Sequence, residues 1–511
     1  MKLFDRLILI LLIISGIFIL NYVGEAGLDQ IRSKISVNND SKTNFNLNVD
    51  SVPDFWNVSE ILSENLSITL IGSNIQNNIN VSNYYFDSGV YNNSIIRIFC
   101  QTRFLSNTTG KLPVLILIHG FGGNHTQTIP FMNYFTSLNY LTVSIDLPGF
   151  DGLSTGFPLI TPETLNIGSS NPKISPFYIL EKAVLRTIYF SKTLGNANTS
   201  EIFLGGASLG GILTIYASAL DNSLSGAAVF LASGDFANAI NYGGLMNAFF
   251  PKDKYPSPLE NKDIQAFFQL FDPLIYSSNA RIPIYYSIGT DDEFFSMEAA
   301  NETYNSFPTE KTLNFIPRLH HNLSVDLMGK SVELWINSTL YKNIQLPVFN
   351  ITQIKKSTIL SDQLEITSSI NTSLPIKSMK LHYKEKYMGN EWKTVNLENI
   401  RTIENVSIAF YILDSPITSV PLEWFITVEL ENGAQYSSYL YETTLSNIFF
   451  IPWMALLGII LVLPIVVQFY IKYRRIVRKG INKETKNHIF LIASEYLTII
   501  AIQALFIYSV Y

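Results

Sequence analysis

Ser208 occupies a sequence context that is suited to nucleophilic catalysis. It is the middle residue of Gly206-Ala-Ser-Leu-Gly210, which follows a short apolar run from Ile202 and precedes a segment of helical character at residues 212–220. Small residues beside a serine let the backbone turn sharply from a strand into a helix without a Cβ clash. The first amides of that helix, beginning with Leu209, would face the oxyanion that forms when the hydroxyl attacks a carbonyl carbon. The pattern predicts a serine nucleophile on a strand-to-helix turn.

A serine nucleophile needs an imidazole to accept its proton, and the chain has six histidines. His320 and His321 follow Ser208 within the same expected domain, directly after an apolar strand end at residues 315–317. The others have different expected places: His119 and His125 flank a glycine turn, His382 lies on a solvated face of a later strand, and His488 lies in a basic loop. We therefore expect His320 or His321 to be the base, with a structural histidine pair as the alternative.

The acid that orients the base is expected in the loop after an apolar strand at residues 282–288. This loop, Gly289-Thr-Asp-Asp-Glu293, offers Asp291 and Asp292. The alternative is that both are solvated turn residues that cap a helix beginning near Phe295. The order serine, aspartate, histidine along the chain is the order used by triads on open α/β sheets.

Apolar runs of strand length alternate with helical segments through the middle of the chain, which predicts an α/β fold with a doubly wound, mostly parallel sheet. Continuous apolar runs are typical of strands buried on both faces, and alternating runs are typical of antiparallel strands at a sheet edge. The strands expected to be buried on both faces are 112–118 and 140–146, and further strands are expected from Ile202, at 227–232 and at 282–288. The edge strands are 67–71 and 95–99, and a helix is expected at 177–192.

Two further regions differ from the rest in composition and in hydrophobic periodicity. Residues 234–280 are too long for a simple connection and carry aromatic clusters, so we expect a partly helical cap insertion whose rings line a pocket or pack the cap down. Residues 345–446 alternate without helical periodicity, which predicts a β-sandwich similar to an immunoglobulin or fibronectin type III module. The sandwich would act as a stalk or as a docking surface for a surface partner.

The ends of the chain predict a membrane protein. Residues 7–23 form an apolar run after two basic residues, and residues 448–470 and most of 489–511 are apolar over bilayer-spanning lengths. The loop between the last two runs is strongly basic, which places it in the cytoplasm and the region between the first and second runs outside the cell membrane. Fourteen N-glycosylation sequons lie between Asn39 and Asn405, which agrees with an external middle, and we expect the sequon at Asn322 to stay unmodified because it adjoins His321.

The seven predicted segments are a signal anchor or signal peptide (1–24), a polar linker (25–50), the catalytic domain (51–344, cap about 234–280), the β-sandwich (345–446), a transmembrane helix (448–470), a basic cytoplasmic loop (471–488) and a second transmembrane helix (489–511).

Charge and cysteine content exclude some functions. The formal net charge is −6 and the central region has no basic stripe, so we expect no nucleic-acid partner. Cys100 is the single cysteine and lies in an apolar run, so it forms no intramolecular disulfide and is expected to be a buried small hydrophobe.

The ordered set of motifs resembles the α/β-hydrolase superfamily, in the branch that holds acetyl xylan esterases, dienelactone hydrolase-like proteins and prolyl oligopeptidase-like peptidases. The motifs are HGFGG at 119–123, DLPGFDG at 146–152, GASLGG at 206–211, IGTDDEFF at 288–295 and FIPRLHHNL at 315–323, and the likeness covers about residues 67–340.

This resemblance implies Ser208 as nucleophile, Asp292 as acid and His321 as base. It implies that the amides of Phe121 and Leu209 hold the oxyanion, and that His119, with Gly120, shapes the oxyanion loop without transferring protons. The chain departs from many relatives by having Arg318 after Pro317, and the doubled histidine and doubled aspartate leave His320 and Asp291 as alternatives.

The sequence as a whole predicts a membrane-anchored, extracytoplasmic serine hydrolase that cleaves a small-molecule ester by an acyl-enzyme route, without a metal or organic cofactor. Two alternatives remain. One is a serine peptidase of prolyl oligopeptidase-like type acting on short peptides, although no propeller domain is recognisable upstream. The other is a surface-binding protein with a hydrolase fold and no catalysis.

Overall fold

The computed structural model describes residues 47–165, 170–242, 250, 257–357, 362–386, 391–398, 400–403, 405–414 and 420–445. Within these ranges no helix combines the length and the apolar character that crossing a bilayer requires. The predicted membrane segments 1–24, 448–470 and 489–511 and the basic loop 471–488 lie outside the described residues.

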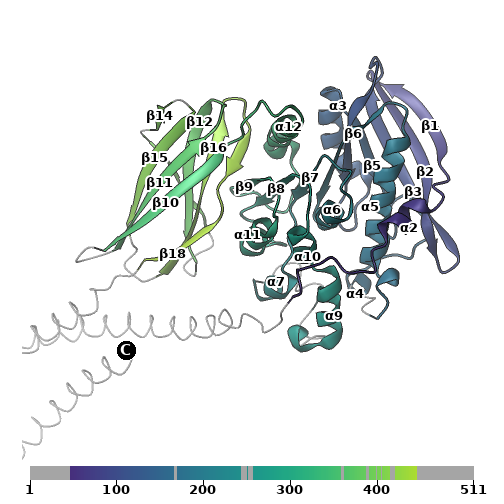
Figure 1. The fold of residues 1–511 in the computed structure, drawn as a ribbon, viewed down its shortest axis with the longest axis horizontal. Helices are drawn as coiled ribbons and strands as arrows, with labels where there is room; N and C mark the ends of the chain where they lie inside the picture. The colour runs from purple at the N-terminus through teal and green to yellow at the C-terminus, as the bar shows by residue number, and fades with distance from the viewer. Residues whose placement is uncertain are drawn as a thin grey trace, which may run out of the picture. The chain divides into compact units, whose positions relative to one another are not determined.

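A nine-stranded sheet forms the centre of the region that holds the predicted site residues, in the order β1-β2-β3-β5-β4-β6-β7-β8-β9 (Figure 1). β1 to β3 are antiparallel to their neighbours, and the strands from β5 to β9 in that order are parallel. The strands are β1 (Thr69–Gln76), β2 (Ile79–Tyr91), β3 (Ser94–Leu105), β4 (Leu112–Ile118), β5 (Leu141–Ile145), β6 (Ala197–Ala207), β7 (Gly226–Phe230), β8 (Ile284–Gly289) and β9 (Lys311–Ile316). The predicted α/β class and mostly parallel sheet are therefore confirmed.

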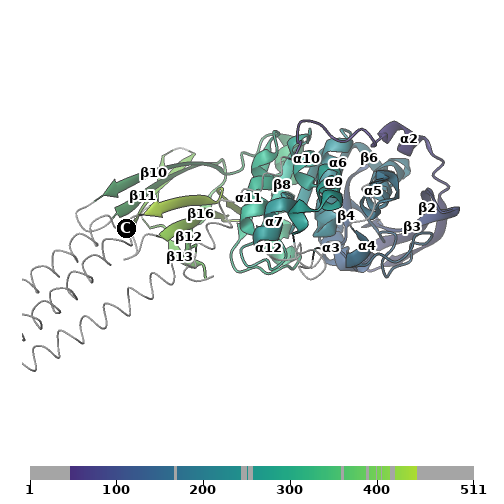
Figure 2. The ribbon, with the colours of Figure 1, turned by 90° about the horizontal axis from the view of Figure 1, so that it is seen from below.

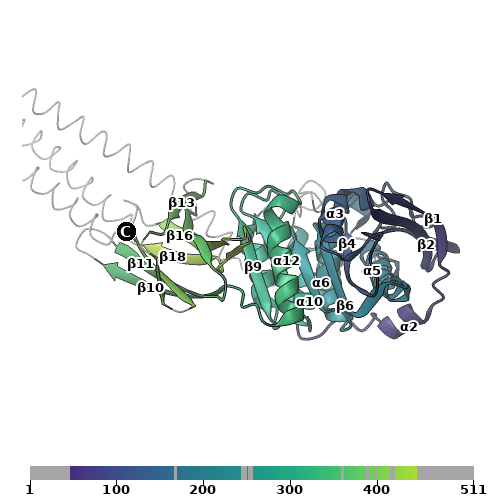
Figure 3. The ribbon, with the colours of Figure 1, turned by 90° about the horizontal axis from the view of Figure 1, so that it is seen from above.

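Helices cover both faces of this sheet, which is why its central strands are apolar throughout. Every residue of β5, β7 and β8 is buried. α3 (Ile129–Ser137) and α12 (Val325–Tyr341) lie side by side on one face (Figure 3), and α5 (Pro176–Thr193) packs beside α6 (Leu209–Leu220) on the other (Figure 2). The remaining helices are α2 (Val58–Ser63), α4 (Pro162–Leu165), α7 (Phe236–Tyr242), α9 (Lys262–Phe271), α10 (Pro273–Ser278) and α11 (Met297–Ser306), with 3-10 turns η1 (His125–Thr128), η2 (Pro172–Ile174) and η3 (Pro258–Glu260).

The insertion between β7 and β8 is helical, as expected, and contains α7, α9 and α10. Its aromatic rings pack against one another and against α5. Phe267, Phe268 and Phe271 are buried, and Phe267 and Phe271 contact Phe177 of α5 with ring centroids 5.6 and 5.8 Å apart. These rings fasten the insertion to the helix layer, whereas its predicted role as a cap over the site stays a prediction.

Two antiparallel sheets follow, in agreement with the predicted sandwich pattern. One has the order β10-β11-β15-β14 and the other β13-β12-β16-β17, with β18 paired to β16. Their strands are β10 (Val348–Ser357), β11 (Asp362–Asn371), β12 (Ile376–Glu385), β13 (Lys393–Asn396), β14 (Arg401–Ile403), β15 (Val406–Asp414), β16 (Val420–Leu430), β17 (Gln435–Ser437) and β18 (Tyr441–Leu445).

The expectation that His382 lies on a solvated face is wrong. The side chain is buried in β12, where its ring stacks on Phe425 with centroids 4.8 Å apart and its nitrogens bond the hydroxyls of Thr394 and Thr427, each at 2.9 Å. β12 is an inner strand of its sheet, paired with β13 and β16. The residues that cover His382 belong to these neighbouring strands, so the polar–apolar pattern of β12 alone did not predict its burial. Burial, with a smaller effect of Lys380, lowers the pKa of His382 to about 4.

β17 covers the outer edge of the nine-stranded sheet. β9 is the last strand of that sheet, and Phe315 N donates to Ser437 Oγ at 2.8 Å. Gln435 donates through Nε2 to Asn314 Oδ1 at 3.2 Å and through its backbone N to Ser331 Oγ of α12 at 2.9 Å. An open edge strand invites pairing with other chains, and these side-chain bonds protect the strand that leads to His320 and His321.

Glu181 of α5 is a buried carboxyl group whose oxygens have no hydrogen-bond partner among the described residues. The side chain is fully buried. Burial, and secondarily the charge of Asp221, raises the pKa of Glu181 well above its ordinary value. The folded protein therefore favours the protonated acid at this position.

We expect Glu181→Gln to stabilise the protein at alkaline pH. The folded-state pKa is raised, so the unfolded chain ionises first, and stability is complete below the ordinary pKa of 4.5 and falls as the pH rises. Gln avoids this loss, so its gain in Tm should be largest at about pH 8 and vanish at about pH 4. Thermal unfolding across this range, with the exposed Glu260→Gln as control, measures the effect, and a gain that does not change with pH would contradict it.

Candidate functional site

Ser208 lies at the turn between β6 and α6 in a strained backbone conformation. Its φ is 58° and its ψ is −120°, a region that a serine rarely adopts and that costs about 1–3 kcal/mol. Ser208 N donates to Phe230 O at 3.0 Å, and Ser208 O accepts from Ile212 N at 3.0 Å. These bonds to β7 and α6 hold the turn, and they leave the side chain at the carboxyl edge of the sheet.

The glycines around Ser208 are required by the close approach of backbone segments. A Cβ on Gly206 would lie 2.2 Å from Gly210 O, and a Cβ on Gly210 would lie 2.4 Å from Ile118 O at the end of β4. Any side chain at either position would push the turn open. The predicted strand-to-helix turn is therefore present, and α6 begins three residues before the range expected from helical character.

The loop after β4 lies directly against Ser208. A Cβ built on Gly120 would be 3.2 Å from Ser208 Cβ and 3.7 Å from its Oγ. The ring of Phe121 packs on Phe150 from the loop after β5, with centroids 5.0 Å apart. Leu209 is the first residue of α6, so its amide has no partner within the helix. The structure thus brings Gly120, Leu209 and Ser208 together.

His119 orients the peptide that joins Gly120 to Phe121. Its Nε2 accepts from Leu147 N at 2.9 Å, so Nδ1 carries the proton and donates to Gly120 O at 2.7 Å. In a trans peptide the C=O of Gly120 and the N–H of Phe121 point to opposite sides, so this bond turns the Phe121 amide away from His119. Burial lowers the pKa of His119 to about 4, against the opposing effect of the Gly120 bond.

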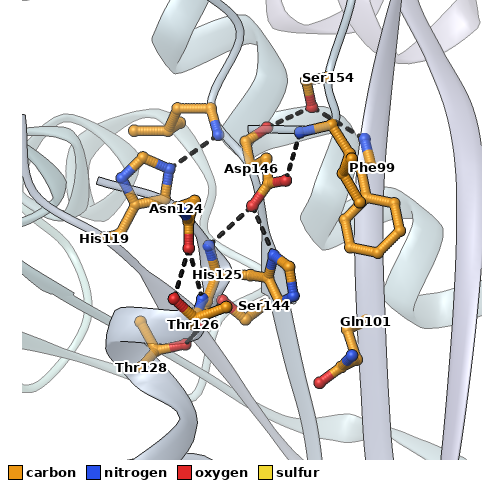
Figure 4. A network of polar contacts seen from close by, with 12 residues as sticks. Phe99, Gln101, His119, Asn124, His125, Thr126, Thr128, Ser144, Asp146 and Ser154 are labelled. Carbon is orange, nitrogen blue, oxygen red and sulfur yellow. Dashed lines mark hydrogen bonds and ion pairs between the residues drawn. The ribbon is translucent and has the colours of Figure 1, made fainter. Parts of the chain in front are cut away.

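Asp146 ties the loops after β4 and β5 together (Figure 4). Its Oδ1 accepts from both the backbone N and the Nδ1 of His125, each at 2.7 Å, and its Oδ2 accepts from Leu153 N at 2.7 Å. Burial raises the pKa of Asp146, but the bonds from His125 and Leu153 outweigh burial and leave it below the ordinary value. His125 is therefore hydrogen-bonded to Asp146 and helps to hold these two loops.

Asp292 and His321 form the hydrogen-bonded pair expected of an acid and a base. His321 Nδ1 lies 2.8 Å from Asp292 Oδ2, and the Asp292 side chain is 0% exposed against 14% for His321. A proton on Nδ1 donates to the carboxylate, which leaves Nε2 as the acceptor. Asp292 Oδ1 also accepts from the backbone N of Phe294 and Phe295, each at 2.9 Å. The alternative of solvated helix-capping aspartates does not hold, because the Asp292 side chain is covered and α11 begins at Met297 with Ser296 as its N-cap.

The two alternative residues lie elsewhere. His320 is 70% exposed, and its Nδ1 is 3.5 Å from Glu293 Oε2. Asp291 Oδ1 accepts from Thr290 Oγ1 at 2.9 Å and has no bond to either histidine within the described residues. Geometry therefore favours His321 over His320 and Asp292 over Asp291.

Glu293 is a site residue that sequence reasoning missed. Its Oε2 accepts from His321 N at 3.0 Å, which holds the backbone of the candidate base. Close packing acts with it, because a Cβ on Gly289 would lie 1.9 Å from Leu319 O. Asp291 N also donates to Leu319 O, at 3.2 Å. The only signal in the sequence was a third acid directly after Asp291 and Asp292.

Ser208, Asp292 and His321 follow parallel strands and so lie along one edge of the sheet. β6 is separated from β8 by β7 alone, and parallel neighbours lie about 4.8 Å apart. The β9 loop bends back over Gly289 towards β8, which is the direction of Ser208. Within the described residues no hydrogen bond joins Ser208 Oγ to a histidine. Phe294 packs edge-on against His321 with centroids 4.5 Å apart, so the candidate base has an apolar neighbour.

Comparison with known proteins finds similarity to one family model and to several solved structures. A family model described as PhoPQ-activated pathogenicity-related protein matches residues 241–385, which include Asp292 and His321 but not Ser208. No curated protein sequence matches the chain.

Several solved structures resemble this chain in fold. An acetyl xylan esterase from Paenibacillus sp. R4 is 17% identical, with 57% of this chain and 97% of that chain covered and a TM-score of 0.49. Acetyl xylan esterase 1 from Thermoanaerobacterium sp. JW/SL YS485 is 18% identical, with 57% and 95% covered and a TM-score of 0.47. Est1E from Butyrivibrio proteoclasticus, with ferulic acid bound, is 17% identical, with 50% and 98% covered and a TM-score of 0.40. Each of these structures is similar to half of this chain or slightly more.

We expect His119→Asn to reduce the loss of unfolding free energy that wild type shows as the pH falls. The folded-state pKa is lowered from 6.5 to about 4, so stability is complete above the unfolded pKa and is lost as the pH falls between these values. The shift corresponds to about 3 kcal/mol in wild type. Asn does not titrate, so chemical denaturation between about pH 7 and pH 4 should show a smaller loss.

The buried His382→Asn is the matched control, because the pKa of His382 is also lowered to about 4. Both variants should lose less folding free energy than wild type as the pH falls from about 7 to about 4. If the unfolding free energies of wild type and His119→Asn fell equally with pH, the prediction that folding keeps His119 neutral would be contradicted.

Proposed function

We propose that the chain is a serine hydrolase that cleaves carboxylic esters through an acyl-enzyme intermediate. The observation that carries the proposal is the 2.8 Å bond between His321 Nδ1 and the fully buried side chain of Asp292, at the same sheet edge as the strained Ser208 turn. A buried carboxylate that fixes one tautomer of a partly exposed imidazole is what a general base requires.

In this mechanism Ser208 Oγ attacks the ester carbonyl carbon while its proton passes to His321 Nε2. The negative charge that develops on the carbonyl oxygen is stabilised by the amides of Leu209 and Phe121. The tetrahedral intermediate collapses, the bond to the alcohol breaks, and His321 returns the proton to the departing alkoxide. A water molecule then attacks the acyl-enzyme carbonyl while its proton passes to His321. The second tetrahedral intermediate collapses, the bond between the acyl carbon and Ser208 Oγ breaks, and His321 returns the proton to Ser208 Oγ as the acid departs.

Asp292 takes no proton in this cycle. Its carboxylate accepts the Nδ1–H bond before and after each transfer and stabilises the imidazolium that forms in between. The bonds that Phe294 N and Phe295 N donate to Oδ1 keep the carboxylate in one orientation. Glu293 and the contact between Gly289 and Leu319 support His321 through its backbone.

We expect a fluorophosphonate probe to label the wild-type chain covalently and to leave Ser208→Ala unlabelled. Hydrolysis of short-chain nitrophenyl esters should fall by about 10³–10⁴ or more in Ser208→Ala, His321→Asn and Asp292→Asn, because the three residues act as one unit. His320→Asn is the matched control and should stay within about threefold of wild type.

Other outcomes separate the alternatives. Folded wild-type protein that takes no label would support a binding protein without catalysis. Labelling with faster turnover of amino-acyl amides than of esters would support a peptidase. Equal losses in His320→Asn and His321→Asn would contradict the assignment of the base.

We further propose that the hydrolase is anchored in the cell membrane with its catalytic region on the outer side. The apolar runs 448–470 and 489–511, and the basic segment 471–488 between them, support this location. A membrane-impermeant amine reagent applied to intact cells should modify lysines between residues 47 and 445. Labelling of lysines from 471–488 instead would reverse the proposed orientation.

A further inference from the structure

An acidic cavity of about 420 Å³ lies apart from the Ser208 turn. Its walls come from three places: α7 with the neighbouring Asp235, α11 with Glu298 and Glu302, and the antiparallel sheet with Glu423. Asp272, at the start of α10, also lines it. Its volume is within the range of small-molecule sites, and no step of the proposed hydrolysis uses these residues.

The negative charge of the cavity is only partly balanced. Lys386 lies 3.3 Å from Glu423 Oε1 and 2.5 Å from Glu442 Oε2, and Lys384 lies 3.0 Å from Glu423 Oε2. These two lysines balance the charges of Glu423 and Glu442 through ion pairs. Four further carboxylates line the cavity and have no lysine, arginine or histidine partner within the described residues: Asp235, Asp272, Glu298 and Glu302.

Two of the lining carboxylates are buried. Glu423 is 1% exposed and its Oε2 accepts no hydrogen bond of good geometry, so ion pairs alone balance its charge. Burial and the nearby Glu298 raise the pKa of Glu423 more than the lysines lower it. Burial and Asp235 raise the pKa of Asp272 to about 7, although three backbone amides donate to its oxygens. Six carboxylates and one lysine line the cavity, and this excess of negative charge favours a cation there.

The arrangement suits an organic cation better than a metal ion. No three acidic, histidine or cysteine side chains of the described chain are grouped closely enough to hold a metal ion. The carboxylates instead belong to separate elements, and Leu47, Ala237 and Leu440 also line the cavity. Methylene groups fit against such surfaces while ammonium groups at a distance from one another meet the carboxylates.

We propose that the acidic cavity binds a small aliphatic polyamine, with ammonium groups paired to Glu298 and Glu302 of α11 and to the carboxylates on the facing walls. Bound in this way, the ligand bridges the helical insertion, α11 and the antiparallel sheet. Binding is independent of catalysis, so Ser208→Ala retains it.

Isothermal titration calorimetry of the full-length chain with spermidine tests the proposal. Wild type and Ser208→Ala should bind saturably at about 0.15 M salt, where attraction between exposed charges is largely screened. The double variant Glu298→Gln/Glu302→Gln should bind at least about tenfold more weakly, because two charge-assisted contacts are lost. Its own Tm without spermidine should not fall, because Glu298→Gln removes repulsion with Glu423 and Glu302 is exposed.

The control is the double variant Glu260→Gln/Asp326→Asn, which makes the same change in net charge at exposed positions outside the cavity. It should bind spermidine within about twofold of wild type. The proposal is overturned if wild type binds no spermidine at this salt concentration, if both double variants lose affinity equally, or if equimolar Ca²⁺ displaces spermidine.

Discussion

The hydrogen bond between Asp292 and His321 is the interaction on which the functional account depends. It joins the loop after β8 to the loop after β9 at 2.8 Å and places a fully covered carboxylate side chain against a partly exposed imidazole. A charge in that position is tolerated because His321 and two backbone amides donate to it. The rest of the region can be understood as the framework that keeps this pair at the edge of the sheet where Ser208 turns.

That framework includes residues far from the site in the sequence. His119 bonds Leu147 N and Asp146 bonds His125, so the loops after β4 and β5 are joined by hydrogen bonds. On the other side, Ser437 and Gln435 of β17 bond β9, the strand that leads to His321. The antiparallel sheet is thus attached to the strand that leads to the candidate base, which gives it a closer relation to the candidate site than a separate stalk would have.

Local patterns predicted the parts of the fold that depend on local chemistry. The apolar run at residues 112–118 matches β4 residue for residue, because a strand covered on both faces must be apolar throughout. Glycines at 206 and 210 marked the serine turn, because only glycine tolerates the backbone contacts found there. Patterns failed where the outcome depended on partners distant in sequence: the burial of His382, the bond from His321 N to Glu293, and the acidic cavity all arise from neighbouring elements.

The most direct measurement is a crystal structure of the chain after reaction with a fluorophosphonate. The account predicts a phosphonyl group on Ser208 Oγ, with one phosphonyl oxygen within hydrogen-bond distance of the amides of Leu209 and Phe121 and with His321 Nε2 facing the adduct. An adduct on another residue, or an adduct on Ser208 with His321 and Asp292 turned away from it, would contradict the central claim.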